Sequence, residues 1–358
     1  MRNALAITIP VLLTLTALTM TPVFAASTCS PAGTTGLTAM IIAKPHQRIT
    51  GMVNAAGCDL GIYIGPGITH VTIKHATITG ANDHAILAQD TSHLTIEQSM
   101  VTGNGVAPHT CSALQASTHC INEDKAVELD GTSHSIIRDN TVTLNVADGG
   151  IGITDDGQIT PGALNSGQPL MSTHNIIINN TLKDDTGGCE IVVSAYNAGG
   201  GDRDNLILHN TILGTSPGNG PFIGQIVIAT DGPNATISNT MVEGNTIHGS
   251  LLPGIVVHSN APGDKITETR IINNDISDNG FYPPTFASIH TPVADNGTTG
   301  IALIAEDFPG EPSAPVLTHT LLVSNTITND MNGVWLCNAS HTRIVDLDGN
   351  AILPIVKC

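Results

Sequence analysis

Five carboxylates in the middle of the chain are the residues best suited to chemistry: Asp155, Asp156, Asp184, Asp185 and Glu190. Two carboxyl groups held close together shift each other's pKa, and such pairs cleave glycosidic bonds as acid and base or nucleophile. Clustered carboxylate oxygens also suit Ca²⁺, and aspartate stabilises tight turns through its own side chain. The residues alone leave all three interpretations open. Ca²⁺ is the one ion that they would suit, and no cofactor is required.

A repeated unit must position these carboxylates. Its clearest copy spans residues 174–194, with an apolar strand, an Asn-Thr corner, a second strand, an acidic turn and a third strand. The corner recurs eight times, and alternating β-branched residues separated by Gly and Asn are typical of strands and turns. Six corners carry asparagine, which tolerates the left-handed conformation and can bond the next asparagine in a stack: Asn140, Asn180, Asn210, Asn245, Asn274 and Asn325.

One such unit cannot bury its own apolar side, whereas stacked units can. The pattern resembles the right-handed parallel β-helix of the pectate-lyase-like superfold. The resemblance implies an all-β, single-stranded solenoid of about nine coils with loop insertions over residues 60–340. Residues 27–59 would then form an N-terminal cap, and residues 341–358 a C-terminal cap. This superfold hosts lyases, hydrolases, epimerases, isomerases and adhesins, so it does not give the function.

The resemblance places a site on the outer face of the third, mostly Gly-led strand and on the loops beside it. Equivalent residues of stacked coils lie ~4.8 Å apart, so the five carboxylates, with Glu190 pointing outward, would flank a shallow groove. Four further residues are expected to bind substrate there: Asp148, Tyr196, Asp231 and His258. Most of the other histidines are interpreted as solvated residues at strand starts or turns.

Outward valines on the same strands, at positions 192, 227 and 256, predict either a covering loop or a ligand platform. The insertions at 155–173 and 281–298 are long enough to supply the cover, and this interpretation is the preferred one.

The first 26 residues have the pattern of a cleaved signal peptide. Arg2 precedes an uncharged apolar run over residues 4–20, and small residues follow at a cleavage-like spacing. An N-terminal membrane anchor is the alternative. We expect a secreted protein, extracellular or periplasmic, with no membrane insertion.

Seven cysteines in an exported chain predict disulfides. The neighbouring pairs are Cys111–Cys120, Cys337–Cys358 and Cys29–Cys58, which leave Cys189 as a buried thiol. The alternative is that all seven are reduced.

The formal charge of −18 opposes nucleic acid and anionic membranes as partners. The expected partner is a polysaccharide or oligosaccharide. Two functions follow: cleavage or rearrangement of a glycan by a lyase- or hydrolase-like enzyme, or a non-enzymatic, adhesin-like scaffold that binds glycan. No paired Asp is followed by the Gly-His-Gly and Arg-Ile-Lys motifs of polygalacturonases, so no specific enzyme family matches.

Overall fold

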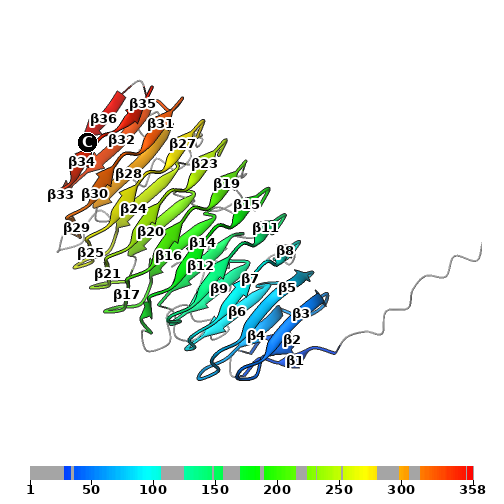
Figure 1. The fold of residues 1–358 in the computed structure, drawn as a ribbon. Helices are drawn as coiled ribbons and strands as arrows, with labels where there is room; N and C mark the ends of the chain where they lie inside the picture. The colour runs from blue at the N-terminus through cyan, green and yellow to red at the C-terminus, as the bar shows by residue number, and fades with distance from the viewer. Residues whose placement is uncertain are drawn as a thin grey trace, which may run out of the picture.

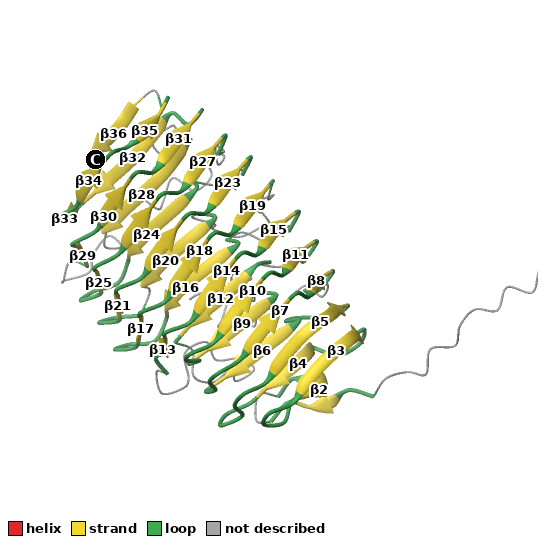
Figure 2. Ribbon diagram, viewed as in Figure 1, coloured by secondary structure: helices red, strands yellow, loops and turns green. Residues whose placement is uncertain are grey.

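The chain folds into an all-β solenoid, a right-handed parallel β-helix (Figure 1). The computed structural model describes residues 28–33, 36–105, 125–146, 149–155, 170–185, 189–214, 224–230, 232–250, 253–279, 298–305, 315–351 and 353–357. Figure 2 shows strands joined by loops along the whole stack. Within these ranges no helix is long and apolar enough to cross a membrane.

The first sheet contains 12 strands, of which all but β1 come one from each coil, and it carries the mostly Gly-led strands of the repeat. In spatial order they are β1 (Ser30–Pro31), β2 (Thr38–Ile42), β4 (Leu60–Ile64), β6 (Ile86–Gln89), β9 (Val127–Asp130), β12 (Ile151–Thr154), β16 (Ile191–Ala195), β20 (Ile226–Thr230), β24 (Ile255–Ser259), β28 (Thr299–Ala305), β32 (Asn332–Cys337) and β36 (Leu353–Lys357). Only β1 pairs antiparallel, with β2.

The second sheet has 18 strands because each coil contributes two short strands or one long one. They are β3 (Arg48–Asn54), β5 (Thr72–Thr79), β7 (Thr95–Glu97), β8 (Met100–Thr102), β10 (Ile136–Arg138), β11 (Thr141–Thr143), β14 (Ile176–Ile178), β15 (Thr181–Lys183), β18 (Leu206–Leu208), β19 (Thr211–Leu213), β22 (Met241–Glu243), β23 (Thr246–His248), β26 (Arg270–Ile272), β27 (Asp275–Ser277), β30 (Leu321–Val323), β31 (Thr326–Thr328), β34 (Arg343–Val345) and β35 (Asp348–Gly349).

A third sheet of six short strands closes the coils. It consists of β13 (Ser172–Thr173), β17 (Gly201–Arg203), β21 (Thr236–Ser238), β25 (Lys265–Thr267), β29 (Val316–Thr318) and β33 (Ala339–Ser340).

Stacking begins before residue 60. Strands β2 and β3 lie in the segment predicted as a cap, yet they pair in parallel with β4 and β5. At the other end, β34 to β36 pair in parallel with the preceding coil, within the predicted C-terminal cap. The stack of parallel strands is therefore longer than the repeat indicates.

Inward apolar side chains form continuous columns through the solenoid. In the first sheet, Ile151 pairs with Ile191, Ile191 with Ile226 and Ile226 with Ile255, all fully buried. Each coil thus buries its apolar face against its two neighbours, as the repeat predicts.

The corners explain the spacing of the polar residues. In the coil of residues 174–184, His174, Asn179 and Asp184 have φ of 57°, 56° and 58°, and equivalent residues of other coils share this conformation. Positive φ is several-fold enriched in Asn, Asp and His among non-glycine residues.

The residue after the middle corner is the predicted asparagine, and its amide stacks on the next one. The side-chain Nδ2 atoms donate to Oδ1 of the next coil at 2.9–3.0 Å, from Asn140 through Asn180, Asn210, Asn245 and Asn274 to Asn325. The predicted asparagine ladder is confirmed.

Two cysteines tie the N-terminal strand to the stack. Cys29 and Cys58 form a disulfide, one of the pairs suggested by the sequence. Cys337 is also disulfide-bonded, and its predicted partner, Cys358, lies outside the described residues, as do Cys111 and Cys120. Cys189 is a buried thiol.

Candidate functional site

The predicted catalytic carboxylates that the structure describes do not share one environment. Asp155 is fully buried and serves the backbone of the next coil: its Oδ1 accepts from the N–H groups of Tyr196 at 2.7 Å and Asn197 at 3.3 Å. Asp184 lies on the surface at a positive-φ corner. Asp156 lies outside the described residues, as do Asp148 and Asp231.

Asp185 ends a second polar ladder, inside the corner that follows β15. Asn104 donates to Asn145 at 3.0 Å, and Asn145 donates to Asp185 Oδ1 from its main-chain N at 2.6 Å and from Nδ2 at 3.0 Å. Burial raises the pKa of Asp185 to about 6, although the Asn145 hydrogen bonds, Glu190 and the charge of Lys125 oppose the shift.

Glu190 points toward the interior, so the prediction of an outward side chain is wrong. Glu190 directly precedes Ile191, which is paired through successive coils with Ile226, Ile255 and Ile301. The equivalent residues before Ile255 and Ile301 are Gly254 and Gly300. A Cβ at either glycine would lie 2.6 Å from a core isoleucine Cγ2, which shows that this column faces inward. Glu190 is 1% exposed and interacts with Asp185.

A buried lysine accompanies this acidic pair. Lys125 is 2% exposed, its Nζ donates to the main-chain oxygen of Cys189 at 2.6 Å, and its charge acts on Asp185. A carboxyl with a raised pKa beside a second acid and a lysine is an arrangement that catalytic sites use, although structural networks also show it. Of the predicted carboxylates, the fold therefore brings Asp185 and Glu190 together, with Lys125 beside them.

The predicted binding residues lie apart from this group. His258 is buried in the outward column of the first sheet, between Ala229 and Ile304. Tyr196 is half-buried and follows β16.

The outward valines, at positions 192, 227 and 256, are also buried. The loops expected to cover them lie largely outside the described residues.

A row of hydrogen-bonded polar side chains, which we did not predict as a site, lies buried on the outward side of the first sheet. Tyr63 Oη donates to Gln89 Oε1 at 3.3 Å, Gln89 Nε2 donates to Asp130 Oδ2 at 3.1 Å, and Thr154 Oγ1 donates to Asp130 Oδ1 at 2.6 Å. Burial, and secondarily the charge of Asp130, raises the pKa of Tyr63. In the neighbouring corner, burial first and then the charges of Asp155 and Asp130 raise the pKa of Asp202 well above its usual value. These groups are as inaccessible to a polymer as Asp155.

Open surface with polar side chains occurs instead along the corner between the third and second sheets. A pocket of about 490 Å³ is lined by one hydroxyl per coil from Thr69, Ser92, Ser133 and Thr173, which form a continuous set of parallel bridges. Arg203, in the coil after Thr173, also lines it. This surface repeats one polar group per coil along the solenoid.

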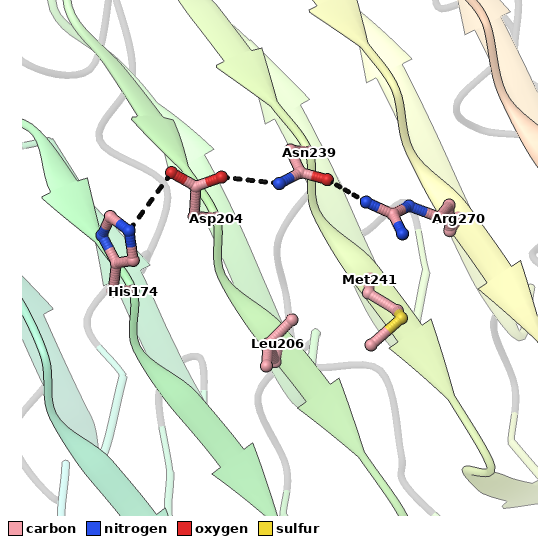
Figure 3. Close-up of a pocket in the computed structure, with 6 residues that line it drawn as sticks. All are labelled: His174, Asp204, Leu206, Asn239, Met241 and Arg270. Atoms are coloured by element: carbon pink, nitrogen blue, oxygen red, sulfur yellow. Dashed lines mark hydrogen bonds and ion pairs between the residues drawn. The ribbon is translucent and has the colours of Figure 1, made fainter.

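A second pocket, of about 310 Å³, lies further along the same corner (Figure 3). Its rim is a chain of polar side chains: His174 Nε2 lies 3.5 Å from Asp204 Oδ2, and Asn239 Nδ2 donates to Asp204 Oδ1 at 2.6 Å. Arg270 Nη2 donates to Asn239 Oδ1. The pocket is thus bordered by an anion, an amide and a cation.

The floor of this second pocket is apolar. Leu206 and Met241, from β18 and β22, occupy paired positions of the second sheet and are both half-buried (Figure 3). Sequence reasoning missed this site because its polar residues come from four coils. The repeat could have indicated the site, because His174, Asp204 and Asn239 occupy the same corner position of successive coils, each with positive φ.

Across the described ranges, no group of three or more His, Cys, Asp or Glu side chains is arranged to hold a metal ion.

Comparisons with solved structures give distant matches. PfbA, a surface adhesin of Streptococcus pneumoniae, is 10% identical, with 89% of this chain and 84% of that chain covered and a TM-score of 0.47. The catalytic domain of a GH87 alpha-1,3-glucanase in complex with tetrasaccharides is 15% identical, with 90% of this chain and 57% of that chain covered and a TM-score of 0.46. The A-module of the Azotobacter vinelandii mannuronan C-5 epimerase AlgE6 is 13% identical, with 89% and 82% covered and a TM-score of 0.33.

Likeness at this level carries no argument about activity, and this chain spans little more than half of the glucanase chain. A search of curated proteins found no match. The family model described as "Right handed beta helix region" matches residues 60–242, which is more than half of the chain. The chain therefore belongs to the right-handed β-helix family.

Proposed function

We propose that this protein is an exported, non-catalytic scaffold that binds a polysaccharide along the corner between its third and second sheets. The observation that carries the proposal is the pocket of Figure 3, which combines an apolar floor with a hydrogen-bonding rim on an open surface. A sugar ring has the matching character, because its faces present C–H groups and its edge presents hydroxyls. Sites of this kind bind through apolar contact and a few placed polar groups.

The rim offers both kinds of hydrogen-bonding partner. Asp204 supplies carboxylate acceptors, Arg270 supplies donors only, and Asn239 supplies both. The floor residues Leu206 and Met241 would contact the face of a sugar ring. The hydroxyl-lined pocket of Thr69, Ser92, Ser133 and Thr173 extends the polar surface over further coils. A polymer that contacts both pockets would gain avidity from the second contact.

Burial of three of the five predicted carboxylates supports a binding role over catalysis. Asp155, Asp185 and Glu190 are each no more than 1% exposed. Hydrolysis of a polymer requires carboxyl groups on both sides of the scissile bond. Side chains enclosed in the corners and core are poorly placed to flank a glycan.

A matched pair of variants on one strand tests the proposal. Leu206→Lys places a charge on the pocket floor, whereas Leu208→Lys alters the next outward position of β18, which pairs with Glu243 and lies outside the pocket. We expect Leu206→Lys to weaken glycan binding at least about fivefold, since ~1 kcal/mol or more of apolar contact is lost. Leu208→Lys should bind as the wild type does.

A glycan array followed by titration of the best ligand would measure this. If the wild type binds no glycan, or if both variants bind equally well, the pocket is not a glycan site.

A glycan-cleaving enzyme is the second candidate, and the raised pKa of Asp185 beside Glu190 and Lys125 favours it. The test is a panel of reducing-sugar and unsaturated-product assays on the wild type and on the double variant Asp185→Asn/Glu190→Gln. Turnover by the wild type that the double variant loses would support this candidate. Equal inactivity of both on every glycan would remove it.

Export is part of the proposal. Structural disulfides persist in oxidising compartments, and both Cys29 and Cys337 are disulfide-bonded. Residues 1–26 would serve as the signal peptide. Expression in a secreting host followed by N-terminal sequencing should find the mature chain beginning near residue 26 or 27.

A further inference from the structure

Five histidines stack face to face along one corner of the solenoid, one from each of five consecutive coils. They are His46, His70, His93, His134 and His174, called the histidine stripe below. Their ring centroids lie 4.9, 4.8, 5.4 and 4.9 Å apart, and three of the four ring pairs are parallel within 8°. All five side chains are exposed, so the stripe is a straight line of imidazole edges about 20 Å long.

The backbone fixes these rings in register. Each stripe histidine has φ between 53° and 61°, and the residues before four of them are joined by parallel bridges. Hydroxyls hold two of the rings: His70 Nδ1 lies 3.1 Å from Thr69 Oγ1, and His93 Nδ1 lies 3.0 Å from Ser92 Oγ. On these rings Nε2 remains as the nitrogen that can meet a ligand.

The geometry disfavours a metal ion on this stripe. A zinc ion binds imidazole nitrogens at about 2.0–2.1 Å, so two ligating rings must converge on one point. Parallel rings spaced by about 5 Å direct their lone pairs along parallel lines. None of the described residues forms a metal-binding group, as noted above.

The surroundings of the stripe are richer in cations than the rest of this acidic chain. Of the 12 Lys and Arg residues, Lys44, Arg48, Lys74 and Arg138 lie within four residues of a stripe histidine, and Arg203 pairs with Thr173 in the next coil. Five carboxylates lie at the same positions: Asp90, Glu97 and Asp204, and the buried Asp130 and Asp202.

Two of these carboxylates already have partners. Lys74 Nζ lies 2.8 Å from Glu97 Oε1, Arg138 also pairs with Glu97, and the Lys74 hydrogen bond, with help from Arg138, lowers the pKa of Glu97. Asp204 lies beside His174 at 3.5 Å and Arg203 at 3.9 Å. Asp90 lines the hydroxyl pocket next to the stripe. Around the stripe five cations therefore match five carboxylates, whereas the rest of the chain carries the whole formal charge of −18.

We propose that the histidine stripe is an acid-activated site for a sulfated polysaccharide. Histidine is the side chain whose charge ordinarily changes between about pH 5 and 8. Protonated rings in this line would present cations to an anionic polymer along the stack of coils. The hydroxyls of Thr69, Ser92, Ser133 and Thr173, each directly before a stripe histidine, line the adjoining pocket and would contact the sugar. Sulfate esters remain ionised at the pH at which imidazole is charged, whereas carboxylates begin to lose their charge.

A flexible single chain suits this surface better than other polyanions do. The stripe is one side chain wide, and the protein around it carries a net formal charge of −18. A DNA duplex or a membrane would bring many charges against that acidic surface, whereas an extended polysaccharide contacts the stripe alone. This inference rests on the proposed function, since it names the charge class of the glycan.

Dextran sulfate and unmodified dextran form a matched pair of probes. We expect dextran sulfate to bind the full-length mature protein about tenfold or more tightly at pH 5 than at pH 7.5, because several exposed ion pairs each add up to a few-fold in affinity. Added salt should reverse the gain. Dextran should show no such pH dependence.

A double variant, His93→Asn/His134→Asn, removes two central rings while keeping a residue that tolerates positive φ. Its control is His75→Asn/His209→Asn, which changes two exposed histidines at the next corner column, with φ of 51° and 53°. The stripe variant should lose most of the acid-induced gain, and the control should keep it.

Two results would overturn the inference. One is an equal gain in both variants, and the other is an equal gain for a DNA duplex of similar charge. If the protein binds neutral glycans without an acid-induced gain for dextran sulfate, this inference alone fails. If it binds no glycan at any pH, the proposed function fails with it.

Discussion

Replacing one rung of the asparagine ladder should destabilise the whole solenoid, and Asn245→Ala is the clearest case. Asn245 is fully buried. Its Oδ1 accepts from the main-chain N of Asn210 at 2.8 Å, and its Nδ2 donates to the main-chain oxygen of Ile207 at 3.0 Å. Alanine would leave both of these buried backbone groups without that partner. Each buried group left unsatisfied costs about 1–3 kcal/mol, so we expect a loss of about 2–6 kcal/mol.

Urea unfolding followed by far-ultraviolet circular dichroism measures this loss. The midpoint should fall at an unchanged m-value, because the surface exposed on unfolding is the same. Thr246→Ala, at the adjacent half-buried corner position, is the control and should change the free energy of unfolding by less than about 1 kcal/mol. If Asn245→Ala were as mild as Thr246→Ala, the ladder would not stabilise the fold, and the reasoning would be refuted.

Three further predictions concern pH, the disulfide and close packing. Burial raises the pKa of Asp330 to about 6, so the native state binds this proton more tightly than the unfolded chain does. The proton therefore stabilises the native state fully below about pH 4, and this contribution is lost as pH rises through 6. Asp330→Asn should therefore be about 2–3 kcal/mol more stable than wild type at pH 7.5 but equal near pH 4; an equal difference at both pH values in thermal unfolding would contradict this. Replacing Cys29 with serine opens the 29-residue link to Cys58 and should cost about 3–4 kcal/mol in denaturant unfolding; no change in midpoint would show that this segment does not unfold with the stack. Gly201→Ala would place a Cβ 2.0 Å from a main-chain oxygen of the next coil and should lower the free energy of unfolding by more than about 4 kcal/mol. Gly199→Ala, in open space at φ 71°, should lower it by about 1–2 kcal/mol. Similar thermal stabilities of the two variants would argue against the coil spacing.

The fold was predictable from the sequence because its determinants are local and repeated. Alternating Ile and Val mark the strands, and the Asn-Thr corners mark the register, so aligning the corners also aligned the core columns. The prediction located the middle asparagine ladder but missed the flanking ones, such as Asn175 to Asn205 at 3.2 Å. Serine, threonine and aspartate replace asparagine in many of those rungs, and this substitution hides the repeat.

The candidate site was harder to predict because a polar residue near a turn can face either way. Asp184 and Asp185 are adjacent in sequence, yet one is exposed and the other is buried at a ladder end. Glu190 stands in a column otherwise rich in glycine, which appeared to be outward but packs against the core. The stripe histidines were correctly interpreted as exposed turn residues, but their stacking depends on insertions of different length between coils.

The asparagine ladder implies that the solenoid folds coil by coil along its axis. A coil cannot satisfy its corner amides fully by itself, since the Nδ2 atoms from Asn140 to Asn274 donate to the Oδ1 atom of the next coil. Folding should therefore advance as a zipper from a nucleus of a few coils, and a stalled chain would always present an open, adhesive end. For the same reason the solenoid can change in length only by whole coils. Gene segments that add or remove one complete coil would preserve every hydrogen bond beyond the junction, whereas a change of one or two residues within a coil would not.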